Sequence, residues 1–107
     1  MSKEDIEKAV KLLEKAIKLE NINAKRFLAL ELISGEHLDQ DIDKGLAMLT
    51  ECADSRDAYA CYKLGKIYFK GDIVLQDLDK SEKYLLSAED NEFTQYAFGI
   101  LYLQKEK

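Results

Sequence analysis

The chain has 107 residues, of which 47% are hydrophobic and 35% are charged, and its formal net charge at pH 7 is −5. This composition predicts a folded chain, and the excess of acidic over basic residues argues against nucleic acid or an acidic membrane surface as the main partner. The sequence also lacks an apolar run of about 18 residues, the length that a membrane-spanning helix needs.

Apolar residues that recur at intervals of three and four predict two helices near the N-terminus. The first covers 3–20 and starts without the apolar core and cleavage site of a signal peptide, so we expect a cytoplasmic protein. Asn21 is the expected end of this helix and Asn23 the expected cap of the next. The second helix covers 24–34, and Gly35 should close it in the left-handed conformation.

Similar signals predict four further helices, at about 42–53, 58–70, 78–90 and 93–104. Asp41, Asp57 and Asp77 precede three of them, where an acidic side chain suits the positive end of the helix dipole. Gly71 is expected to close the fourth helix of the chain as Gly35 closes the second. Asn91 marks the break between the last two.

Many positions repeat with a period of 36 residues. Acidic helix starts, core leucines and helix-ending glycines all keep it: Asp5, Asp41 and Asp77; Leu13, Leu49 and Leu85; Gly35 and Gly71. In the last unit the spacing is 34, so that one triplet recurs in altered form: Leu64, Gly65 and Tyr68 as Phe98, Gly99 and Tyr102. A fixed period of this size predicts stacked helix hairpins in an all-α solenoid.

One stretch carries a pattern that is typical of a known family. It reads A-x-x-x-L-G-x-x-Y-x-x-G, a loop, then D-x-x-K and a later alanine, at Ala60, Leu64, Gly65, Tyr68, Gly71, Asp77, Lys80 and Ala88. In this the chain resembles the Sel1-like repeats, relatives of the tetratricopeptide repeats. The resemblance implies a right-handed α-solenoid of antiparallel helix hairpins with about six helices. The expected units are 1–22, 23–56, 57–91 and 92–107, of which the first and last are half repeats.

The chain departs from the family pattern at several positions. Ile73 replaces a loop glycine, Gly45 and Ser81 replace the alanine that follows a lysine, and Ala29 replaces the helix glycine. We expect the fold to tolerate all of these changes.

Glycines and tyrosines of the repeat are expected to have packing roles. A glycine inside a helix costs about 0.5–1 kcal/mol relative to alanine, so Gly65 and Gly99 predict points where another helix comes close. Tyr68 and Tyr102 are expected to be buried and to fill the wider end of each hairpin.

The sequence offers no set of residues for catalysis, a metal or a cofactor. His37 is the single histidine and stands in a polar loop, so we expect no enzyme activity and no metal site. Cys52 and Cys61 are expected to be buried reduced thiols. The alternative, which the resemblance implies from secreted members of the family, is a disulfide that joins neighbouring helices.

A protein or peptide is the expected partner. Stacked hairpins curve, and in related solenoids the first helix of each hairpin lines the concave side. The expected partner-binding residues on those helices are Phe27, Glu31, Lys63, Lys66, Ile67, Ala97 and Ile100. These helices also carry a row of basic residues, but no aromatic residue alternates with them as a stacking platform, so nucleic acid is not expected.

The last helix is more apolar than one neighbouring helix can cover, since Ile100, Leu101, Tyr102 and Leu103 follow one another. We therefore expect either a fragment of a longer protein or a homodimer through this C-terminal helix. The alternative to a free-standing scaffold is an accessory domain that packs against a catalytic domain absent from this chain. The resemblance implies such an arrangement for some bacterial DNA-mobilisation proteins.

Overall fold

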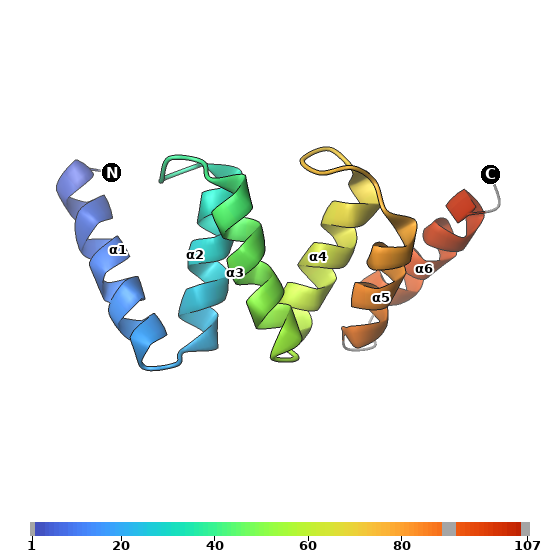
Figure 1. Ribbon diagram of the computed structural model, residues 1–107, viewed down its shortest axis with the longest axis horizontal. Coiled ribbons are helices and arrows are strands. Elements are labelled where there is room, and N and C mark those ends of the chain that lie inside the picture. The colour runs from blue at the N-terminus through green and yellow to red at the C-terminus, as the bar shows by residue number, and fades with distance from the viewer. Residues whose placement is uncertain (1, 89–91, 106–107) are drawn as a thin grey trace. The chain divides into compact units, whose positions relative to one another are not determined.

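The computed structural model describes residues 2–88 and 92–105, whose regular structure is entirely helical (Figure 1). The helices are α1 (Lys3–Lys18), α2 (Ile22–Ser34), α3 (Ile42–Asp54), α4 (Ala58–Lys70), α5 (Leu78–Ser87) and α6 (Glu92–Lys105). The predicted all-α fold with six helices is confirmed for these residues. The predicted break at Asn91 lies outside them. None of the described helices is long and apolar enough to cross a membrane.

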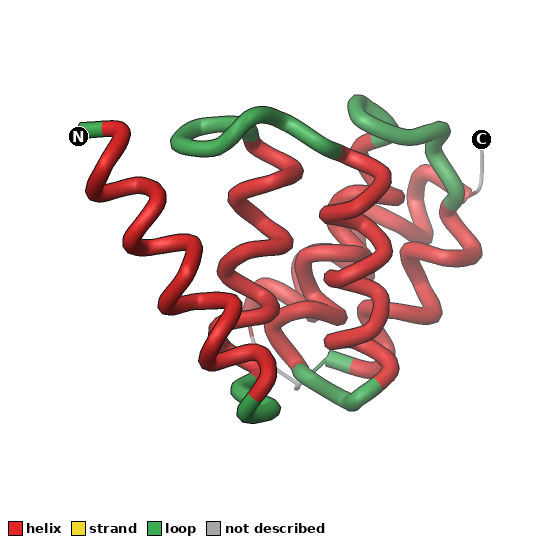
Figure 2. Tube along the Cα trace, turned by 60° about the vertical axis from the view of Figure 1, so that its left-hand side comes forward, coloured by secondary structure: helices red, strands yellow, loops and turns green. Residues whose placement is uncertain are grey.

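The chain divides into two compact units, Met1–Cys52 and Ala53–Lys107. The first contains α1, α2 and most of α3, and the second contains α4, α5 and α6. In the described part of the chain, turns and loops connect one helix to the next (Figure 2). This division follows compactness and not the repeat, so the boundaries of the repeat units stay a prediction.

Polar side chains cap most of the helices where the sequence predicts a start. Asp41, Asp57 and Asp77 each accept a hydrogen bond from the backbone N–H three residues further on, at 2.9–3.1 Å. The Ser2 hydroxyl does the same for α1 at 3.2 Å. Each bond satisfies one of the N–H groups that the first turn of a helix leaves without a partner.

The turn between α1 and α2 differs from its prediction. Glu20 adopts the left-handed conformation, with a φ of 63°, and Asn21 is extended. The Asn21 side chain then accepts a hydrogen bond from the backbone N–H of Ala24 at 3.0 Å, so Asn21 is the cap of α2. The predicted cap, Asn23, lies inside the first turn of α2, because the reversal is made one residue before Asn21.

The loops that follow α2 and α4 are built alike. Gly35 and Gly71 end these helices in the left-handed conformation that the sequence predicts, with φ values of 68° and 67°. Five residues later a glutamine side chain donates a hydrogen bond back to the helix that has just ended: Gln40 Nε2 to the Ile33 carbonyl at 2.9 Å, and Gln76 Nε2 to the Phe69 carbonyl at 2.8 Å. A Cβ at either glycine would also crowd that glutamine.

Helices α4 and α5 approach closely at Gly65. A Cβ at this position would lie 2.6 Å from Leu85 Cγ, closer than such atoms approach. The fully buried Ser81 hydroxyl donates a hydrogen bond to the Gly65 carbonyl at 2.7 Å. One turn further along α4, the half-buried Tyr68 stacks on Tyr84 with ring centroids 6.1 Å apart. Gly65 and Tyr68 thus both pack within this hairpin.

Helices α2 and α3 also approach each other closely, but here the glycine lies on the second helix of the hairpin and not on the first. Gly45 on α3 is buried, and a Cβ there would lie 2.7 Å from Ile33 Cγ1 and 2.8 Å from the carbonyl oxygen of Ala29. Ala29 is fully buried on α2. The close approach of α2 and α3 is therefore made at a glycine of α3, whereas that of α4 and α5 is made at a glycine of α4.

Two predicted packing roles on α6 are wrong. No described residue lies within 4 Å of a Cβ built on Gly99, and Tyr102 is 50% exposed. The physical reason is that no described helix takes the place beside α6 that α5 takes beside α4. Leu101 is fully buried whereas Leu103 is 70% exposed, so α6 packs through one face and leaves the other open.

Candidate functional site

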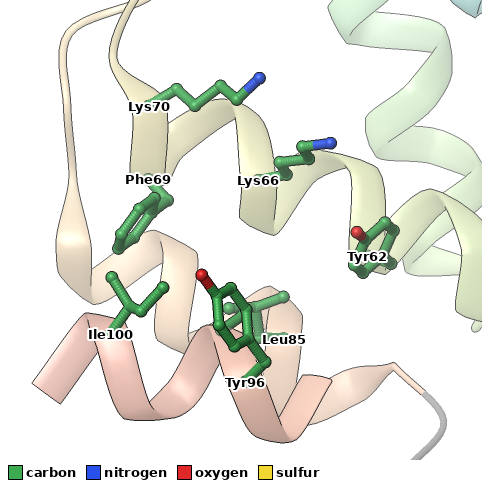
Figure 3. A pocket seen from close by; sticks show the side chains of 8 residues that line it. Tyr62, Lys66, Phe69, Lys70, Leu85, Tyr96 and Ile100 are labelled. Atoms are coloured by element: carbon green, nitrogen blue, oxygen red, sulfur yellow. The ribbon is translucent and has the colours of Figure 1, made fainter. Parts of the chain in front are cut away.

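A cavity of about 290 Å³ lies in the second unit between α4 and α6, with α5 at its floor (Figure 3). The residues that line this α4–α6 pocket are Tyr62, Lys66, Phe69 and Lys70 from α4, Leu85 from α5, and Tyr96, Ala97 and Ile100 from α6. Leu85 is almost fully buried, whereas Tyr96 is 70% exposed. The pocket therefore has an apolar floor and a mouth that solvent reaches.

Helical periodicity explains why these side chains share one pocket. On α4, Tyr62 lies four residues before Lys66, and Phe69 and Lys70 lie three and four residues after it, which places them on one face. Tyr96 and Ile100 are likewise one turn apart on α6. Phe69 points from α4 toward Ile100 (Figure 3). The two walls are thus single helix faces, and their separation leaves the cavity.

Two lysines give the pocket its charge. Lys66 and Lys70 are exposed, and none of the acidic residues whose side chains the structure describes lines the pocket. Neither lysine makes an ion pair with a residue whose side chain the structure describes. The α4 side of the pocket therefore carries two positive charges, whose ammonium groups point away from α6 (Figure 3), in a chain whose net charge is −5.

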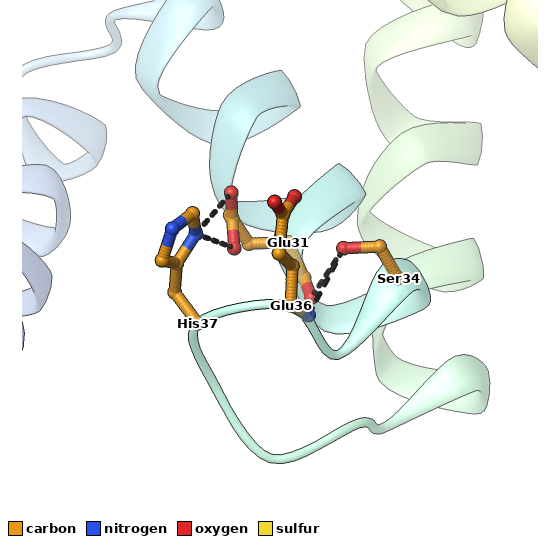
Figure 4. Close-up of polar contacts among 4 residues, drawn as sticks. All are labelled: Glu31, Ser34, Glu36 and His37. Atoms are coloured by element: carbon orange, nitrogen blue, oxygen red, sulfur yellow. Dashed lines mark hydrogen bonds and ion pairs between the residues drawn. The ribbon is translucent and has the colours of Figure 1, made fainter.

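A smaller cavity of about 160 Å³ lies in the first unit. Its lining comes from α1, α2 and the loop after α2: Ile6, Ala9, Val10 and Leu13; Phe27 and Glu31; His37 and Leu38. Phe27 is 55% exposed, and the Glu31 side chain is only 14% exposed. The Glu31 carboxylate accepts a hydrogen bond from His37 Nδ1 at 3.0 Å (Figure 4).

Glu31, Glu36 and His37 bring three atoms of the kind that bind metals to within 4.8 Å of one another. The sequence prediction set His37 aside and missed this grouping, which arises because the turn at Gly35 folds the loop back over the end of α2. The available signal was the spacing E-x-x-x-x-E-H. Glu36 and His37 are exposed, and a structural zinc site takes four ligands. The grouping is thus accounted for by the hydrogen bond between His37 and Glu31.

The family model of the Sel1 repeat matches residues 1–21 and 58–92, more than half of the chain. This chain belongs to the Sel1 repeat family. No curated protein and no solved structure matches it. Sel1 repeats commonly mediate protein–protein interactions. The second matched segment includes α4 and α5, so the Sel1 repeat itself builds one wall and the floor of the α4–α6 pocket.

The predicted partner-binding residues fall in both units of the Sel1 repeat chain. Three line the α4–α6 pocket: Lys66, Ala97 and Ile100. Two line the cavity of the first unit: Phe27 and Glu31. The other two line neither of these cavities: Ile67 is half-buried, and the Lys63 ammonium lies 5.5 Å from the centre of the Tyr59 ring. The role of all seven in binding stays a prediction.

The sequence prediction missed the aromatic residues of the pocket. Tyr62 and Phe69 stand four residues before and three after Lys66, and Tyr96 stands four before Ile100. The helical spacing from the predicted residues would have identified them. Lys70 belongs to the row of basic residues on the helices that are expected to bind the partner.

Cys52 and Cys61 are both buried, and no disulfide joins them. The Cys61 thiol donates a hydrogen bond to the Ala53 carbonyl at 3.6 Å. Burial, followed by the carboxylates of Asp57 and Asp54, raises the pKa of the Cys61 thiol. Since the thiolate is the reactive form, these contacts lower the reactivity of the Cys61 thiol.

Proposed function

We propose that this Sel1 repeat chain is a protein–protein interaction module that binds a segment of another protein in the α4–α6 pocket. The observation that carries the proposal is a cavity of about 290 Å³ with an apolar floor and an exposed aromatic residue, Tyr96, at its mouth. Protein interfaces concentrate their binding energy where apolar or aromatic side chains fill such pockets. The mechanism is binding by a preformed surface, without catalysis and without a cofactor.

Ala97 is the residue at which the pocket can best be closed. It is half-buried on α6 and lines the cavity with a single methyl group. A large side chain in its place would occupy the space that a partner side chain needs. Gln104, on the same helix, is exposed and does not line the pocket, so the same substitution there provides a matched control.

The test is a selection of displayed peptides on the immobilised chain, followed by affinity measurements with the selected peptides in synthetic form. Ala97→Trp should weaken binding about tenfold or more, as for loss of a central contact, and Gln104→Trp should not. Circular dichroism establishes that both variants are folded. The proposal fails if no peptide is enriched, or if the selected peptides bind Ala97→Trp as tightly as the unsubstituted chain.

The open face of α6 favours a second candidate function, in which another helix packs there. A Cβ added at Gly99 would have no described residue within 4 Å, and Tyr102 and Leu103 are exposed. The helix would come from a second copy of this chain, or from a catalytic domain for which the chain is an accessory domain. Light scattering over a range of concentrations distinguishes these. A dimer that Leu103→Lys dissociates supports the second copy, and a monomer contradicts it. Leu101 is unsuitable for this test because it is fully buried.

A further inference from the structure

The described residues that line the α4–α6 pocket carry charge of a single sign. Lys66 and Lys70 of α4 are the charged residues among these eight. They stand in a chain whose net charge is −5, so the pocket differs from the average of the surface around it. The two lysine side chains attract acidic groups of a partner and repel basic ones.

Other lysines of the second unit are held by the chain itself. Lys105 forms ion pairs with Glu82 at 2.6 Å and Asp79 at 3.2 Å, and its hydrogen bonds to these two carboxylates raise its pKa. The Lys80 ammonium lies 5.1 Å from the centre of the Tyr68 ring. No comparable contact holds Lys66 or Lys70 among the residues whose side chains the structure describes. Their charges are available to a partner.

We infer that the segment bound in the pocket carries a large apolar side chain flanked by two carboxylates. This inference rests on the proposed function and names the class of its partner. The apolar side chain enters the cavity over Leu85, and the carboxylates lie against Lys66 and Lys70. The two lysines are one turn apart, about 6 Å along the axis of α4.

That spacing defines a sequence for the partner. Carboxylates four residues apart on a helix are also about 6 Å apart along its axis. In a segment of the form Glu-x-x-apolar-Glu, the apolar residue lies between the two carboxylates on the same helix face. One short amphipathic acidic helix can thus contact both the apolar floor of the pocket and the two lysines of α4.

The test uses the full chain and a set of synthetic helical peptides that share one scaffold. In three of them the apolar residue is leucine and the two flanking residues are both Glu, both Gln or both Lys. A fourth keeps the glutamates and has serine in place of leucine. Fluorescence anisotropy should rank the affinities Glu above Gln above Lys, by about two- to fivefold for each lysine contacted, and added salt should reduce the difference. The serine peptide should bind at least about tenfold more weakly.

Charge reversal in the protein gives the matched comparison. In the variant Lys66→Glu/Lys70→Glu the order of the peptides should invert. The control variant Lys80→Glu/Lys83→Glu has the same net charge and changes two lysines that do not line the pocket, so it should keep the original order. Inversion in both variants would show that only the overall charge matters, and it would overturn the inference.

The remaining outcomes separate the inference from the proposed function. Equal affinities for the Glu, Gln and Lys peptides, lost in Ala97→Trp, would overturn the acidic class and leave the pocket as a binding site. Equal binding of the serine and leucine glutamate peptides would also overturn it, because attraction would then extend to any polyanion. A third outcome is that none of the four synthetic peptides binds, whereas display selection enriches peptides whose binding is lost in Ala97→Trp. In that case the inference about an acidic partner fails, and the proposed binding function of the pocket is supported.

Discussion

The hairpins α2–α3 and α4–α5 solve the same packing problem with opposite residues. At the crossing of α4 and α5, the first helix has a glycine, Gly65, and the second has Ser81. At the crossing of α2 and α3, the first helix has Ala29 and the second has Gly45. The comparison teaches that the close approach of two helices in this repeat can be made at a glycine of either helix.

The two crossings also differ in polarity. In α4–α5 the Ser81 hydroxyl is fully buried and donates its hydrogen bond to the Gly65 carbonyl. In α2–α3 the equivalent position is Gly45, which has no side chain to donate. The α4–α5 crossing therefore combines close approach with a buried hydrogen bond, and substitutions can test the two contributions separately.

The largest expected effect is that of Gly65→Leu. The added side chain would collide with Leu85, whose Cγ lies 2.6 Å from a Cβ at this position. Such overpacking costs about 1–3 kcal/mol or more, which lowers the melting temperature by roughly 4–8 °C for each kcal/mol. Thermal unfolding followed by circular dichroism measures it. The same substitution at Gly99, which has open space, should leave the melting temperature nearly unchanged; equal losses at both sites would refute the close crossing.

A smaller loss is expected for Gly45→Ser, which brings a Cβ to 2.8 Å from the carbonyl oxygen of Ala29. The same Cβ would lie 2.7 Å from Ile33 Cγ1, so the substitution should lower the free energy of unfolding by about 1–2 kcal/mol, measured by urea unfolding. Gly99→Ser, at a glycine with no such neighbour among the described residues, is the control. A free energy of unfolding that Gly45→Ser leaves unchanged would contradict the close approach of α2 and α3.

The smallest expected effect is that of Ser81→Ala, which removes the buried hydrogen bond but keeps the Cβ. It should cost about 1 kcal/mol, as for a typical intramolecular hydrogen bond. Chemical unfolding at equilibrium measures this difference. A free energy of unfolding unchanged by the substitution would mean that close approach alone holds the α4–α5 crossing together.

Local chemistry made most of the fold predictable. The caps at Asp57 and Asp77 and the left-handed turns at Gly35 and Gly71 each depend on a few neighbouring residues, so their sequence signals were sufficient. The role of Gly45 was not predictable from its own position, because it depends on its contacts with Ile33 and the Ala29 carbonyl of the neighbouring helix.

The errors on α6 have a related cause. The repeat pattern assigns Gly99 and Tyr102 to a crossing, but a crossing requires a second helix, and no described segment supplies one. The pocket was predicted only in part for the same reason. Lys66, Ala97 and Ile100 could be chosen from their places in the repeat, whereas the cavity depends on how far α6 stands from α4.

The central claim is that the α4–α6 pocket binds a segment of another protein, and a titration followed by methyl NMR tests it most directly. The leucine peptide with two flanking glutamates would be added to the chain with labelled alanine, isoleucine and valine methyl groups. We expect the signals of Ala97 and Ile100 to shift in a saturable way, and those of Ala9 and Val10 in the first-unit cavity to stay in place. Saturable shifts at Ala9 and Val10, with Ala97 and Ile100 unchanged, would contradict the account.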